Sequence, residues 1–173
     1  MVNSPELATG ITRDIYGMPA FITLTSSDPR TTASWFTETL DFIELFAMPP
    51  GDSPTVIHLR RWRYQDILIR RAETTGPVGE GIQVSFAAEY EELEVLAARA
   101  RSRGAGVEGP ADTSWNTRDL AVMTPQGLRV VFTARRPEPL RDEVFTEKMH
   151  RWNAEQVLPR RRLLHDDPPR FSH

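Results

Sequence analysis

The chain has 173 residues, a formal net charge of −3 at pH 7 and no cysteine. This length suffices for one domain with a sizeable core, or for two small units that share a core. The lack of cysteine excludes disulfides, thiolate catalysis and cysteine-bound metals, and the charge gives no reason to expect a nucleic acid or an acidic membrane as partner.

Residues 1–17 are polar and interrupted by glycine and proline, so we expect a loose N-terminal arm. They show neither the basic stretch nor the apolar stretch of a secretory signal. No window approaches the ~18 consecutive apolar residues of a membrane-spanning helix. These features favour a cytoplasmic protein with no membrane partner.

Residues 18–72 predict a strand, a helix and three further strands. The first strand is expected over Phe21–Thr25, and the helix begins at Asp28 and Pro29, residues suited to the N-cap and to the first helical position. The three later strands are expected over Phe42–Ala47, Thr55–Trp62 and Asp66–Arg71.

Residues 80–136 repeat this order. The expected elements are a strand over Ile82–Phe86, a helix over Glu89–Arg103, and strands starting at Val107 and covering Asn116–Met123 and Leu128–Thr133. An offset of about 62 residues places Leu24 on Phe86 and Ile69 on Val131. An internal repeat of this kind indicates a duplicated structural unit. The sequence therefore predicts an α+β domain over residues 18–136, with modules at 18–72 and 80–136.

Residues 137–173 form a tail outside the repeat. Five apolar side chains can share one helical face: Leu140, Val144, Phe145, Met149 and Trp152. We expect this helix to end in the stretch that contains Pro159, the basic run 160–162 and the segment Asp166-Asp167-Pro168-Pro169. It would pack on the body or on a second subunit, and a lid over the binding cleft is the alternative.

The order of motifs in residues 18–136 resembles the vicinal-oxygen-chelate superfamily, which includes glyoxalases, bleomycin-resistance proteins and extradiol dioxygenases. The matching segments are Ile22-Thr23-Leu24, Asp28, Trp35-Phe36, Leu40-Asp41-Phe42 and, in the last hairpin, Thr124-Pro125-Gln126-Gly127-Leu128. The resemblance implies two tandem βαβββ modules that form curved mixed sheets around a cleft, with a C-terminal helical extension. It also implies a homodimer, because dimers are common in that superfamily.

The resemblance also locates where a metal would be bound. Enzymes of the superfamily hold a divalent metal with His, Glu or Gln on the first and last strands of each module. The corresponding residues here are Phe21, Ile69, Gln83 and Val131. Since only Gln83 has a donor atom, and divalent metals need several converging donors, we expect no metal and no other cofactor.

Strand alternation indicates which side chains would line the cleft. Ile57 and Leu59 suit the face that packs on the helix, so their neighbours on the strand should point the other way. By this reasoning the candidate ligand-binding residues are Phe21, His58, Arg60, Trp62, Ile69, Gln83, Trp115, Asp119, Arg129 and Val131.

Three functional hypotheses follow from this lining. The leading one is a metal-free binding protein of the bleomycin-resistance type that sequesters an aromatic or planar natural product. The second is a metal-independent enzyme such as a cyclase, isomerase or lyase, with His58 and Asp119 as acid–base residues. The third is a structural or regulatory dimer with a vestigial cleft.

Overall fold

The computed structural model describes residues 13, 17–18, 20–73 and 81–163. The expected N-terminal arm lies almost entirely outside these residues, and so do segments 74–80 and 164–173. No helix within the described residues combines the length and the apolar character that crossing a membrane requires.

The first module contains four strands and one helix in the predicted order. Its elements are β1 (Ile22–Ser26), α1 (Pro29–Leu40), β2 (Ile43–Met48), β3 (Val56–Arg60) and β4 (Asp66–Arg71). The strand order in the sheet is β1-β4-β3-β2, with β1 parallel to β4 and the other neighbours antiparallel.

The second module repeats this arrangement. Its elements are β5 (Gln83–Ala87), α2 (Glu92–Ser102), β6 (Gly106–Asp112), β7 (Thr117–Met123) and β8 (Arg129–Arg135), with the sheet order β5-β8-β7-β6. The predicted α+β fold, two tandem βαβββ modules followed by a C-terminal helix, is confirmed.

Helix α1 begins and ends where its sequence indicates. The carboxylate of Asp28 accepts a hydrogen bond from the Thr31 backbone N–H at 3.1 Å, which satisfies an amide with no partner inside the helix. Pro29 occupies the first turn, and Asp41 ends the helix in the left-handed conformation with φ 66°. Phe36 and Leu40 on the inner face are fully buried.

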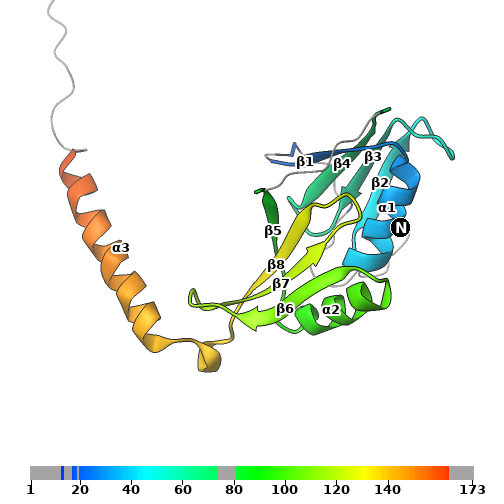
Figure 1. Cartoon of the computed structure of the whole chain (residues 1–173). Coiled ribbons are helices and arrows are strands. Elements are labelled where there is room, and N and C mark those ends of the chain that lie inside the picture. The colour runs from blue at the N-terminus through cyan, green and yellow to red at the C-terminus, as the bar shows by residue number, and fades with distance from the viewer. Residues whose placement is uncertain (1–12, 14–16, 19, 74–80, 164–173) are drawn as a thin grey trace, which may run out of the picture.

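A chain of aromatic rings joins the two modules in one hydrophobic core. The ring centroids of Phe36 and Phe42 are 5.5 Å apart, those of Phe42 and Phe86 are 5.6 Å apart, and those of Phe86 and Phe132 are 6.2 Å apart. Helices α1 and α2 contact each other on the same side of the molecule (Figure 1). The opposite face of each sheet is therefore not covered by its module's own helix.

The strand register corrects one prediction about the repeat. Leu24 lies beside Ile69 in the first sheet, and Phe86 lies beside Phe132 in the second. Phe132, not Val131, is therefore the counterpart of Ile69, and the offset on the last strands is one residue longer than on the first. The prediction that Ile69 faces the cleft is wrong, because its side chain packs towards α1 and is 0% exposed.

Helix α3 (Glu143–Leu163) follows a short 3-10 turn at Glu138–Leu140 and extends away from both sheets (Figure 1). The Asn116 side chain anchors its start by donating to the Asp142 carbonyl at 3.0 Å and accepting from the Asp142 N–H at 2.7 Å. The helix continues through Pro159 to Leu163, the last residue that the structure describes, within the stretch 159–169 where the sequence predicts its end.

Candidate functional site

The candidate site lies on the open face of the first sheet, by which we mean the face opposite α1. Ile57 and Leu59 of β3 are paired with Ile69 and Ile67 of β4, and all four are buried on the helix side. Alternation then directs the intervening side chains to the open face. Those side chains are Val56, His58 and Arg60 of β3, Asp66, Leu68 and Arg70 of β4, and Phe21, Thr23 and Thr25 on and before β1.

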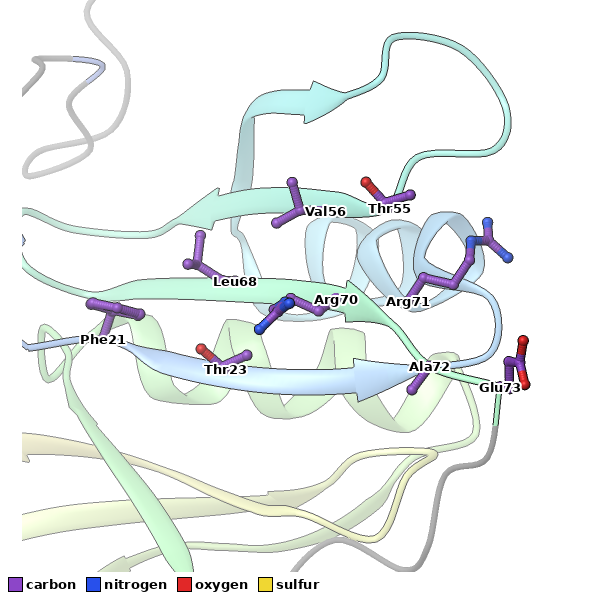
Figure 2. Close-up of a pocket in the computed structure, with 9 residues that line it drawn as sticks. All are labelled: Phe21, Thr23, Thr55, Val56, Leu68, Arg70, Arg71, Ala72 and Glu73. Carbon is purple, nitrogen blue, oxygen red and sulfur yellow. The ribbon is translucent and has the colours of Figure 1, made fainter.

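A pocket of about 770 Å³ occupies this open face. Its lining residues are Phe21, Thr23, Thr55, Val56, Leu68, Arg70, Arg71, Ala72 and Glu73. Figure 2 shows Phe21, Thr23, Val56, Leu68 and Arg70 projecting from the same side of their strands, with α1 behind the sheet. We call this volume the first-sheet pocket. Its floor is apolar, and the Thr23 hydroxyl and the Arg70 guanidinium lie beside this floor.

The two arginines of this pocket differ in their partners. Arg71 donates to the backbone carbonyls of Pro54 at 3.3 Å and Ser27 at 3.0 Å, so its guanidinium fastens the end of the sheet to neighbouring loops. Arg70 makes no hydrogen bond or ion pair within the part of the chain that the structure describes. Its donors are thus available to a ligand.

A buried ion-pair network lies farther along the same open face. The Asp66 Oδ1 atom is 2.8 Å from His58 Nε2 and accepts a hydrogen bond from Arg60 Nε at 2.7 Å. The Asp66 side chain is 0% exposed, and the ring of Phe46 packs edge-on against His58. His58 and Arg60 are therefore held by a shared carboxylate and bind β3 to β4.

Four predicted site residues lie on the corresponding face of the second sheet, as the alternation predicted: Gln83, Asp119, Arg129 and Val131. Asp119 accepts hydrogen bonds from the hydroxyls of Thr117 at 3.0 Å and Thr133 at 2.7 Å. Arg129 forms an ion pair with Glu108 at 2.8 Å. The structure thus does not bring Asp119 and His58 together, since they lie on different sheets with separate partners.

The two predicted tryptophans lie away from the first-sheet pocket. Trp62 follows β3 in the turn before β4, and the guanidinium of Arg61 lies 4.9 Å from its ring centroid. Trp115 is 68% exposed and packs edge-on against Phe145 of α3. It lines a separate pocket of about 420 Å³ between the second sheet and α3. The predicted residues thus do not form one site.

Sequence reasoning missed Val56, Leu68 and Arg70 as lining residues. A signal for them was present in the hairpin between β3 and β4. Directly opposed residues of an antiparallel hairpin point to the same face, so assigning Leu59 to the helix side also assigns Ile67 to it. The neighbouring Leu68 then belongs to the open face.

The donor atoms on these faces do not suit a divalent metal. Leu68 replaces Ile69 as the last-strand position of the first module, and it has no donor, like Phe21 and Val131. Across the described residues, no group of three or more His, Cys, Asp or Glu side chains is placed to hold a metal ion. A site of the superfamily's metal-binding kind does not fit these residues.

No protein-family model and no curated protein matches the chain. Solved structures do match it. A glyoxylase/bleomycin resistance protein/dioxygenase domain from Frankia sp. EAN1pec is 21% identical, with a TM-score of 0.56 over 72% of this chain and 96% of that one. TioX from Micromonospora sp. ML1 is 19% identical, with a TM-score of 0.54 over 69% and 99% of the two chains.

FosX, a fosfomycin resistance protein from Listeria monocytogenes, matches in a complex with Mn(II) and sulfate. It is 15% identical, with a TM-score of 0.54 over 72% of this chain and 94% of that one. At these identities the likeness shows the fold. The chain has the two-module fold of the vicinal-oxygen-chelate superfamily.

Proposed function

We propose that this chain is a small-molecule-binding protein that sequesters an aromatic or planar organic compound in the first-sheet pocket, without a metal. The observation that carries this proposal is the pocket itself, about 770 Å³ in volume and floored by Phe21, Val56 and Leu68. Small-molecule sites are typically concave, roughly 300–1,000 Å³ in volume and mostly apolar with a few polar groups.

Phe21 is the side chain best placed to stack on a planar ligand. Its ring is 48% exposed and projects from the sheet into the pocket (Figure 2). Aromatic rings gain from stacked or edge-on contact with other rings beyond the area they bury. A planar compound would cover this ring while the apolar surface of Leu68 contacts its edge.

The structural likenesses support the antibiotic-resistance class of this proposal. FosX is a fosfomycin resistance protein, and the Frankia protein is a glyoxylase/bleomycin resistance protein/dioxygenase domain. Sequestration differs from metal-dependent chemistry in needing only a binding surface. The donor-poor strands of this chain favour sequestration, because three of its four metal positions have no ligand atom.

The test is a titration of the chelator-treated protein with a panel of planar aromatic antibiotics by isothermal calorimetry. Each mixture is then analysed by chromatography and mass spectrometry. We expect saturable binding with an unchanged ligand. Phe21→Ala should weaken binding about tenfold, since an aromatic contact contributes up to ~1.5 kcal/mol. Val95→Ala, on the exposed side of α2, is the control that should bind like the parent.

Three outcomes would contradict the proposal. Conversion of a ligand to a product would indicate an enzyme, and binding that appears only after a divalent metal is added would indicate a metal site. Unchanged affinity in Phe21→Ala would place the ligand elsewhere. The matching Trp115→Ala variant tests the separate pocket beside α3, because the two pockets share no residue.

The alternative, a metal-independent cyclase, isomerase or lyase, has weaker support. General acid–base catalysis needs a titratable pair within reach of one ligand. His58 and Asp119 are bonded to different partners on different sheets. Turnover that disappears when either residue is replaced would revive this alternative.

A further inference from the structure

We infer that the ligand of the first-sheet pocket is an organic anion, whose carboxylate is bound by Arg70 with the Thr23 hydroxyl beside it. This inference rests on the proposed function and adds the chemical class of the ligand. Three features support it: the position of Arg70, the lack of described partners for its N–H groups, and the apolar surface beside it.

Arg70 lies on an inner strand of the sheet, one residue before the C-terminal end of β4. Its strand, β4, runs between β1 and β3, and its register partners are Thr25 and Val56. Figure 2 shows its guanidinium directed towards β1, on the side of Thr23. A ligand that rests on this face beside Arg70 would cover part of its exposed side chain.

Among the described residues, the donors of Arg70 have no partner, in contrast to those of its neighbour Arg71. The Arg71 guanidinium is occupied by two backbone carbonyls, whereas Arg70 has no hydrogen-bond or ion-pair partner among the described residues. The Thr23 hydroxyl likewise makes no hydrogen bond there. Two donor groups without partners, on the same face of adjacent strands, are complementary to an oxyanion.

The charges of the pocket favour an anion over a cation. Its lining contains Arg70 and Arg71 and a single acid, Glu73. Glu73 forms no ion pair with Arg70 and points away at the end of the strand (Figure 2). A guanidinium presents a planar fork of N–H groups that matches the two oxygens of a carboxylate. Among the oxyanions that this fork matches we assign a carboxylate, because a singly charged group loses less hydration beside the apolar floor than a phosphate does.

The spacing along β4 sets the form of the ligand. Leu68 and Arg70 are two residues apart on one strand, so their stems are about 7 Å apart at a rise of roughly 3.3 Å per residue. A planar body resting on Phe21 and Leu68 would thus place a directly attached carboxylate near Arg70. Aryl carboxylates satisfy this geometry.

The test compares 2-naphthoate with 2-naphthamide, two planar probes of nearly the same shape that differ in charge. Calorimetric titrations are made with the parent, Arg70→Gln, Arg70→Lys and the control Arg135→Gln, which removes an exposed arginine from the second sheet. We expect the parent to bind the acid about tenfold more tightly than the amide, since hydrogen bonds to charged groups are the stronger ones. Arg70→Gln should abolish this preference, Arg70→Lys should keep part of it, and Arg135→Gln should keep all of it.

The outcomes separate the inference from the proposed function. Equal affinity of the parent for both probes, or an unchanged preference in Arg70→Gln, would overturn the carboxylate assignment while binding itself stands. Failure of both probes to bind the parent would count against the pocket as a ligand site, and so against both proposals. Unfolding curves are recorded for each variant, and we expect Arg70→Gln to unfold like the parent because Arg70 is an exposed side chain.

Discussion

Asp66 is the residue whose replacement should cost the most stability on the open face. Its buried carboxylate is hydrogen-bonded to both His58 and Arg60. Asp66→Asn would remove the buried charge that His58 and the Arg60 guanidinium share. Removing one partner of a buried ion pair typically costs about 3 kcal/mol or more. We expect a loss of that size in the free energy of unfolding, measured by urea denaturation.

Glu94→Gln provides the control for this prediction. Glu94 pairs with Arg118 at 2.9 Å, but its side chain is 64% exposed. Exposed ion pairs contribute roughly 0–1 kcal/mol because water screens them. A loss in Asp66→Asn no larger than that in Glu94→Gln would show that the network is not a stability element.

The capping residue Asp28 gives a prediction about pH. Hydrogen bonds from the Thr31 hydroxyl, and then from the Thr31 backbone N–H, lower the pKa of the Asp28 carboxyl below its ordinary 3.8. A carboxyl whose pKa is lower in the folded state stabilises the fold above its unfolded pKa and loses that contribution as pH falls through the folded pKa. Asp28→Ala should therefore be less stable than the parent at neutral pH. The difference in the free energy of unfolding should shrink below about pH 3.8, and a difference independent of pH would contradict this.

At the residue scale, alternation predicted the faces of β3 correctly and those of β4 incorrectly. His58 and Arg60 lie opposite the helix side as expected, but Ile69 is in the core beneath α1. The error came from aligning the modules with one constant offset. A single extra residue in one module reverses the face of every later strand position, since strand side chains have a period of two. The register of the β3–β4 hairpin is a local signal, and it assigns the residues of β4 to the correct face.

Between elements, Arg61 connects the first module to the second. Its guanidinium donates to the Ala87 carbonyl at 3.0 Å and to Glu92 at 2.9 Å, and it lies 5.0 Å from the ring centroid of Phe132. The residue is fully buried. Arg61→Met would keep much of the packing volume but lose both hydrogen bonds to the second module. We expect the free energy of unfolding to fall by about 2 kcal/mol or more, since a hydrogen bond to a charged group makes a net contribution of roughly 1.5–3 kcal/mol.

Arg103→Met is the matched control, because Arg103 of the α2 end also reaches the first module. It pairs with Glu38 of α1, but both side chains are about half exposed. Its loss should stay below about 1 kcal/mol. Equal effects in the two variants, measured by the same denaturation, would show that Arg61 does not join the modules specifically.

The element scale also shows why the role of Arg61 could not be predicted from the sequence. The pattern at the end of the predicted strand Thr55–Trp62 indicates only a charged residue before a turn, and charged residues are usually exposed. Burial of Arg61 depends on contacts with residues 26 and 31 positions away. The order of helices and strands was predictable because it depends on local patterns. The placement of one module against the other was not.

For the whole molecule, the exposed apolar side chains predict a second copy of the chain. Phe46 and Met48 of β2 are exposed, as are Met149 and Trp152 of α3, and Val144 of α3 is 76% exposed. Because α3 extends away from the sheets (Figure 1), the apolar side chains of α3 stay exposed in the single chain. Helices in proteins gain most of their stability from tertiary packing, and large exposed apolar patches mark interaction sites.

We therefore expect sedimentation equilibrium to give twice the 19.7 kDa mass of one chain. Val144→Glu should shift the equilibrium towards single chains, because a carboxylate in an apolar contact loses its hydration without a partner. Val95→Glu makes the same change at a valine that is also exposed, on the outer side of α2, and should leave the mass unchanged. A single-chain mass for the parent would contradict the homodimer. A dimer that tolerates Val144→Glu would place the interface on the sheets, at Phe46 and Met48, and leave α3 for another partner.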